Sequence, residues 1–168
     1  KSILFHLQIS FEGRVPLLGA TSFSVDDIHI ENGQCPPIAS CDFERDSCGF
    51  TTDLYYWLRS RGQMGPGDPP VDHTTGTSKG FFVSLYIKDA FHGGQFELRS
   101  QWINATHPMC VSFWYYVSSA SASLFNLLVS TSSLEDPLDR QAVYNLTALQ
   151  SDEWQKVQVT ITKTEPYY

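Results

Sequence analysis

The sequence has little positive charge and no long apolar run. It holds 11 Lys and Arg residues against 18 Asp and Glu in 168 residues, a formal net charge of −7. A surface that binds phosphates needs clustered basic residues, often among aromatic ones. We therefore expect neither nucleic acid nor anionic membranes as partners. Because no apolar run approaches the ~20 residues of a spanning helix, this segment is not expected to insert into a membrane, and any signal for secretion or anchoring is expected outside it.

The four cysteines show none of the spacings that are typical of zinc sites. Cys41 and Cys48 lie seven positions apart, without a CxxC pattern or a histidine at ligand spacing. Two Asn-x-Thr triplets, at Asn104 and Asn145, match the acceptor for N-linked glycans, which are added only in the secretory pathway. Together, the cysteines and the triplets favour an oxidising compartment with disulfide bonds. They also predict that N-linked glycans are attached at both asparagines.

Motifs for catalysis are absent as well. The five histidines are scattered, and none lies in a G-x-S-x-G or H-E-x-x-H context. Glycoside hydrolysis needs two carboxylates at a suitable separation, so Glu44 with Glu12 or Asp72 is a formal alternative. Nothing in the sequence fixes the distance between these carboxylates. We therefore expect no enzymatic activity.

The hydrophobic pattern is dominated by alternation with a period of two, which is typical of strands with one buried face. Such alternation occurs at residues 5–11, 111–117, 125–129 and 157–161, and no segment has a convincing helical period. Many short strands separated by turn residues predict an all-β jelly-roll sandwich of two antiparallel sheets. Further strands are expected at residues 23–30, 55–59, 81–87, 95–99 and 142–146. The residues expected to be buried are Phe5, Leu7, Ile9, Phe11, Val111, Phe113, Tyr115, Val157, Val159 and Ile161.

Residues 61–79 are rich in Gly, Pro and Thr and show no periodicity. They predict a long surface loop, which is either a recognition element or only an elaborate connection. His73 lies within it, and a hydrogen-bonding role in the loop is the simplest interpretation.

Trp114 and Tyr116 have the parity opposite to the expected core residues, so we expect them to line an interface or to lie beneath a glycan.

Several rare residues of the chain occur in a characteristic order. They are Cys41-x-Phe43-Glu44, Cys48-Gly49-Phe50, Trp57, Gly65-Pro66, Asp72-His73-Thr74, Gly80-Phe81-Phe82, Cys110-x-x-Phe113-x-Tyr115 and Trp154. Upstream of them lie Phe11-Glu12-Gly13 and Ser24-Val25-Asp26-Asp27-Ile28 through Cys35. This pattern resembles the MAM domain family, in which the first set is similar to the earlier part of a domain and the upstream set is similar to its final strands.

This resemblance implies a jelly-roll domain without catalytic activity, found in cell-surface or secreted glycoproteins and in membrane-anchored ectodomains. Its role there is adhesion, assembly or receptor architecture, through protein partners in neighbouring MAM repeats or other chains. The resemblance also implies a disulfide bond between Cys41 and Cys48. Cys110 and Cys35 occupy the third and last cysteine positions of the family, so in a tandem array their partners are expected outside this segment.

The order of the motifs is rotated, because an ending precedes a beginning. We therefore predict that residues 1–35 are the C-terminal strands of a preceding MAM domain, that residues 36–40 are a linker, and that residues 41–168 are a MAM domain lacking its final strands. Equivalent strands from a following repeat or a neighbouring chain would then complete residues 41–168.

Acidic residues in loops and at strand ends leave one cofactor question open. Glu44, Asp72, Asp26 and Asp27 are hard oxygen donors that suit a structural Ca²⁺, and the resemblance allows for one, since some MAM domains carry a cation. Acidic residues in turns also commonly accept local backbone hydrogen bonds. No other cofactor is expected. The alternative function is a carbohydrate-binding jelly roll that uses a cation and exposed aromatic residues.

Overall fold

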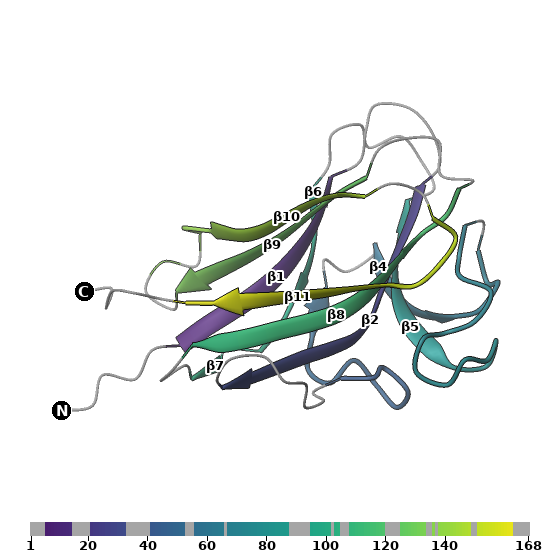
Figure 1. Cartoon of the computed structure of the whole chain (residues 1–168), viewed down its shortest axis with the longest axis horizontal. Coiled ribbons are helices and arrows are strands. Elements are labelled where there is room, and N and C mark those ends of the chain that lie inside the picture. The colour runs from purple at the N-terminus through teal and green to yellow at the C-terminus, as the bar shows by residue number, and fades with distance from the viewer. Residues whose placement is uncertain are drawn as a thin grey trace.

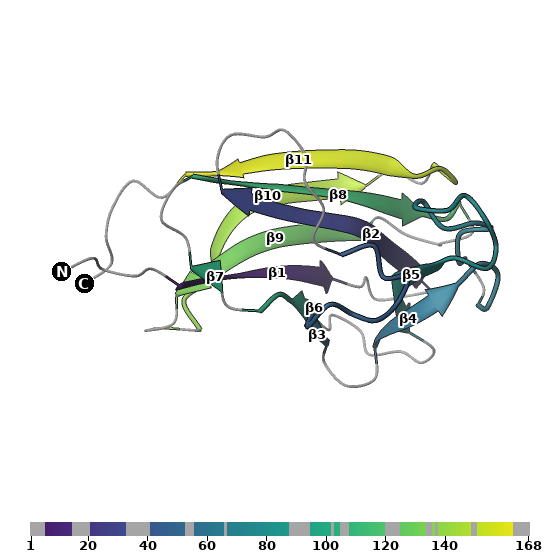
Figure 2. The same ribbon diagram turned by 90° about the horizontal axis from the view of Figure 1, so that it is seen from below.

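The computed structural model of the chain describes residues 6–14, 21–32, 41–52, 56–65, 67–87, 95–101, 103–104, 108–119, 125–133, 136, 138–148 and 151–162. In these ranges the chain forms strands and turns but no helix, and hence no helix that could cross a membrane. Two antiparallel sheets pack against each other, as Figures 1 and 2 show. The predicted β-sandwich is therefore confirmed.

The first sheet holds six strands, in the order β10-β9-β1-β6-β3, with β7 also paired to β1. Their bounds are β1 His6–Arg14, β3 Thr51–Thr52, β6 Gln95–Arg99, β7 Ile103–Asn104, β9 Phe125–Ser133 and β10 Gln141–Ala148. The second sheet has the order β11-β8-β2-β5-β4. Its strands are β2 Thr21–Asn32, β4 Trp57–Arg61, β5 Phe81–Ile87, β8 Met109–Val117 and β11 Gln155–Ile161.

The observed strand bounds follow the alternation closely. β5 and β6 coincide with the expected segments, whereas β4 begins at Trp57 and extends to Arg61. The two-residue strands β3 and β7 were not expected, because a strand that short shows no alternation. Short sheet partners of this kind are determined by the neighbouring strand rather than by their own residues.

The core between the sheets is made of the inward-facing side chains of both layers. Phe11 of β1 and Phe113 of β8 are both fully buried, and their rings meet edge to face with centroids 5.0 Å apart. Tyr115 is only partly buried and packs at the margin of the core, and the side chains of Phe5 and Leu7 lie outside those described. The expected core residues that are buried are Ile9, Phe11, Val111, Phe113, Val157, Val159 and Ile161.

The strands of residues 1–35 occupy the centre of both sheets. β1 lies between β9 and β6, and β2 lies between β8 and β5. In this structure they therefore pack with the strands of residues 41–168 in one sandwich. The physical reason is burial, because Ile9, Phe11, Phe23 and Val25 are fully buried in this core. The assignment of the two parts to successive repeats of a longer protein stays a prediction, and residues 33–40 lie outside those described.

Candidate functional site

A bulge in β2 turns two carboxylates toward the same loop. The pairing of β2 with β8 shifts register between Asp26 and His29, and Asp27 has φ 50, a left-handed conformation that Asp tolerates better than most residues. The extra residue breaks the alternation, so that Asp26 and Asp27 both contact the loop, while Ile28 returns to the core. The carbonyl of Ile28 then accepts a hydrogen bond from the amide of Cys41 at 3.0 Å.

His73 is the point at which the loop meets this bulge. Its ring nitrogen Nδ1 lies 2.5 Å from Oδ2 of Asp27, and its backbone amide donates to Oδ2 of Asp26 at 3.1 Å. The imidazole also stacks on Trp114, with centroids 3.9 Å apart and planes inclined by 19°. The hydroxyl of Thr74 donates to the second oxygen of Asp27 at 2.9 Å. We call residues 67–80 the anchored loop.

Asp72 organises the turn inside the anchored loop. It is 1% exposed, and its carboxylate accepts hydrogen bonds from the amide and hydroxyl of Thr75, both at 2.6 Å, and from the amide of Thr77 at 3.0 Å. Burial alone would raise the pKa of Asp72, but these hydrogen bonds outweigh it and hold the pKa below its usual value. A Cβ at Gly80 would overlap the Asp72 carboxyl group, which explains why glycine closes the turn.

Aromatic side chains on the outer face of the second sheet lie beneath this loop. The indole Nε1 of Trp154 donates to the carbonyl of Val71 at 2.9 Å. Tyr116 is 5% exposed and its ring lies 5.8 Å from that of Trp154. Trp114 and Tyr116 were expected to line an interface or to lie beneath a glycan. In the structure the chain's own loop contacts Trp114, and Trp154 packs against Tyr116.

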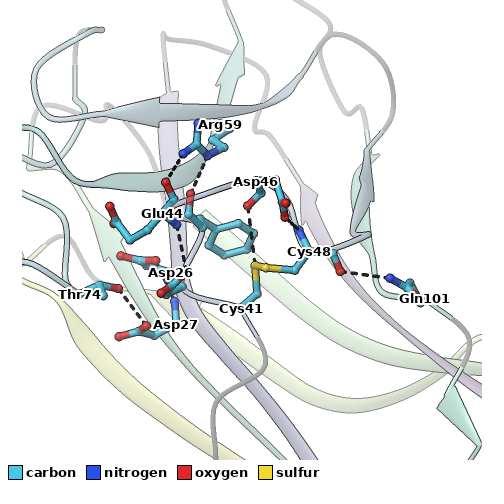
Figure 3. The surroundings of a disulfide bond; sticks show 11 residues. Asp26, Asp27, Cys41, Glu44, Asp46, Cys48, Arg59, Thr74 and Gln101 are labelled. Atoms are coloured by element: carbon cyan, nitrogen blue, oxygen red, sulfur yellow. Dashed lines mark hydrogen bonds between the residues drawn. A yellow bond between two sulfur atoms is a disulfide. The ribbon is translucent and has the colours of Figure 1, made fainter.

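The Cys41–Cys48 disulfide holds a second carboxylate-bearing segment beside the bulge. The two cysteines are bonded, with their Cα atoms 5.7 Å apart. Within that segment, Oε1 of Glu44 accepts from the amide of Phe81 at 2.9 Å, and Arg59 donates to the carbonyl of Glu44 at 2.7 Å. Figure 3 shows the side chains of Asp26, Asp27 and Glu44 gathered on one side of the disulfide.

The electrostatics reflect the gathering of acidic groups. Burial raises the pKa of Asp26 to about 8, and Asp27 and, more weakly, Asp72 add to the rise. Burial also raises the pKa of Glu44, with Asp72 contributing and the Phe81 amide opposing. The structure thus brings the four predicted cation ligands into one region. In the contacts described above, the carboxylate oxygens of these four residues meet amide, hydroxyl and imidazole groups. Within the described ranges, no three His, Cys, Asp or Glu side chains are arranged to hold a metal ion. Calcium binding stays a prediction.

Glu12 belongs to a different cluster, on the first sheet. It lies directly opposite Glu97 in the pairing of β1 with β6, and both are 3% exposed. Arg140 contacts both carboxylates, and Arg99 forms an ion pair with Glu97. Two like charges facing each other across strands are destabilising unless they are compensated, and the arginines supply that compensation. The sequence alone does not predict this cluster, because the cluster depends on cross-strand register.

The remaining predicted sites have mixed outcomes. Cys110 is disulfide-bonded, but its partner is not among the described residues, so the expectation that the partners of Cys110 and Cys35 lie outside this segment stays a prediction. Cys35 itself lies outside the described residues. Asn145 is exposed on β10, as predicted for a glycan acceptor. Asn104 lies in β7, opposite His6 of β1, and its side chain is not among those described. Attachment of glycans at either residue stays a prediction.

Comparisons with known proteins agree with these features. The family model "MAM domain, meprin/A5/mu" matches residues 41–168. Two curated relatives are "MAM domain-containing protein 2" of mouse and of human, each 26% identical over 144 and 146 residues, covering 78% of this chain and 20% of the relative. "Thyroid hormone-induced protein B" of Xenopus laevis is 25% identical over 120 residues, covering 64% of this chain and 17% of the relative. No solved structure matches.

The chain thus spans about a fifth of the length of these curated relatives. The family match includes the Cys41–Cys48 disulfide, the anchored loop and nine of the eleven strands found in the described residues. The chain belongs to the MAM domain family.

Proposed function

We propose that this chain is a non-catalytic interaction module of an extracellular glycoprotein with several MAM domains, acting in adhesion, assembly or receptor architecture. The observation that carries the proposal is the family match over residues 41–168. MAM domains are generally extracellular modules of this kind. The short coverage of the relatives fits one unit within a much longer protein, and the Cys41–Cys48 disulfide fits an oxidising compartment.

Within this proposal, the anchored loop presents the contact surface for a protein partner. Its tip, residues 74–79, is exposed throughout, whereas Asp72 and Gly80 at its base are buried. The stacking of His73 on Trp114 and the bond from Trp154 to Val71 hold the base against the sheet. A tip held by a rigid base loses little conformational entropy on binding, which favours recognition by loops on a scaffold.

In a tandem array, residues 1–35 would complete the preceding repeat, residues 36–40 would be the linker, and the corresponding strands of the next repeat would complete residues 41–168. The support for this proposal is the rotated order of the family motifs, together with the match of the family model to residues 41–168. In this structure β1 and β2 fill the two central positions that such strands would occupy.

The test is saturable binding of the secreted chain to cells that display the full ectodomain, and to beads coated with the chain itself. Lys79→Glu reverses the charge at the exposed tip and is expected to weaken binding. Gln158→Glu, at an exposed position of β11, is the matched control. Equal binding by both variants and the wild type would show that the tip is not part of the contact surface. A saturable, chelator-sensitive signal on a glycan array, with no protein binding, would favour the carbohydrate-binding alternative.

A further inference from the structure

The edge strand β10 lacks the protective features that the other three sheet edges have. Exposed edges offer unpaired amide and carbonyl groups to other chains, and proteins protect them by shortness, by charge or by covering. At the other end of the first sheet, β3 has only two residues. In the second sheet, β4 carries Arg59 and Arg61, and β11 carries the exposed Lys156.

β10 is long, apolar in part and uncharged. It spans eight residues, Gln141–Ala148, with no charged residue and no proline. It pairs with β9 on one side, and no strand of the described ranges pairs with its other side. Its register shift falls between Ala142 and Tyr144, so residues 144–148 remain in regular pairing. Uncharged segments rich in Val, Tyr, Leu and Thr are those that associate edge to edge.

The glycan acceptor triplet lies in the middle of this regular part. Asn145 pairs with Leu128 of β9, and Thr147 pairs with Asn126. Residues two apart lie on one face of a strand, and both Asn145 and Thr147 are exposed, while Tyr144 and Leu146 pack against the core. The hydroxyl of Thr147 donates to Oδ1 of Asn126 at 3.0 Å, which fixes this face outward.

We propose that an N-linked glycan on Asn145 protects the β10 edge and prevents edge-to-edge association of the sandwich. A branched, hydrated oligosaccharide on the outer face would exclude a second strand from residues 144–148 by its volume. It thereby replaces the charge that Lys156 supplies on β11 and the arginines supply on β4. The inference rests on the proposed extracellular setting, because the glycan is added only in the secretory pathway.

The experiment compares variants of the chain secreted from human cells. Peptide mass spectrometry measures occupancy of Asn145, and light scattering after size-exclusion chromatography measures mass over a concentration series. Asn145→Gln removes the glycan and is expected to convert a monomer into concentration-dependent dimers and larger species. Thr147→Ser keeps the acceptor triplet and is expected to stay glycosylated and monomeric.

A third variant separates edge protection from a general effect on folding. Asn145→Lys lacks the glycan but places a charge on the edge, so it is expected to restore the monomer. The matched control Asn104→Gln removes the other acceptor and is expected to leave the mass of the assembly unchanged. An unoccupied Asn145, a monomeric Asn145→Gln variant, or association of both Asn145 variants would each overturn the inference. Loss of partner binding by a protein with an intact Asn145 glycan would instead contradict the proposed function.

Discussion

The imidazole Nδ1 of His73 lies 2.5 Å from the carboxylate Oδ2 of Asp27, across 46 positions of sequence. This contact joins a residue of the anchored loop to the bulge of β2, and it is one of the contacts between the loop and the second sheet. The side chains are 27% and 15% exposed, so the pair is partly shielded from solvent. Partly buried, charge-assisted hydrogen bonds contribute more than exposed ones.

Asp27→Ala is expected to loosen the anchored loop. It removes the partner of His73 and the acceptor for the Thr74 hydroxyl, for an expected loss of about 1–3 kcal/mol in the free energy of unfolding. Hydrogen exchange of residues 67–80 should accelerate more than that of β8. Ser78→Ala, at an exposed position of the same loop, is the control. Unchanged exchange in Asp27→Ala would show that the aromatic contacts alone hold the loop.

The raised pKa of Asp26 predicts that stability falls as pH rises. Its pKa is about 8 in the folded protein against a reference of 3.8, so the folded state binds the proton more tightly than the unfolded state. The stabilising contribution is fully present below about pH 4 and is lost as pH rises to about 8, at no more than about 1.4 kcal/mol per pH unit. Denaturant unfolding at several values between pH 5 and pH 8 measures this slope. Asp26→Asn should show a shallower slope, and equal slopes would exclude Asp26 as the titrating group.

Calcium binding is a separate prediction at the same cluster. A cation among Asp26, Asp27, Glu44 and Asp72 would relieve their mutual repulsion, so it would raise the melting temperature most at pH 8. A titration with Ca²⁺, with Mg²⁺ as the control, measures the shift, and Asp72→Asn should reduce it. The absence of any calcium-dependent shift at millimolar concentration would show that the carboxylates serve only the hydrogen bonds seen in the structure.

Much of the fold could be predicted because alternation and burial agree along each strand. Ile9 and Phe11 in β1, and Val157, Val159 and Ile161 in β11, keep one parity and are buried. The bulge at Asp27 could also have been recognised from the sequence. The buried residues Phe23 and Val25 are followed by Ile28 rather than by an apolar residue at position 27, which is a change of phase.

Other features could not be predicted, because they depend on which strands become neighbours. The contacts of Arg140 with Glu12 and Glu97 depend on the register of β1 with β6. They also require that Arg140, which directly precedes β10 and is distant in sequence, lies beside these two strands. Likewise, the sequence placed His73 in a loop but gave no sign that its ring stacks on Trp114. Hydrophobic periodicity and turn residues report only on the structure of neighbouring positions in the sequence, whereas such contacts depend on which strands pair in the fold.

Gly80→Ala is expected to disrupt the turn around Asp72. The added methyl group would overlap the Asp72 carboxyl group, which is buried and already bonded to Thr75 and Thr77. We expect a loss of about 1–3 kcal/mol, measured by denaturant unfolding. The matched control is Gly76→Asn in the same loop, where φ is 66, no atom lies within 4 Å of an added Cβ, and Asn tolerates the conformation. Similar losses for both variants would point to backbone strain rather than to the Asp72 contact.

Phe11→Ala tests whether residues 1–35 belong to the same folding unit as residues 41–168. Phe11 is fully buried against Phe113 of β8, at a ring distance of 5.0 Å. Truncation of a buried Phe costs about 3–5 kcal/mol where it fills a core. A loss of this size, in one cooperative transition reported by both tryptophan fluorescence and circular dichroism, is expected if β1 completes this sandwich. Gln158→Ala on the exposed face of β11 should leave the transition unchanged. If Phe11→Ala behaves like that control, β1 does not complete this sandwich in solution, and the assignment of residues 1–35 to a preceding repeat gains support.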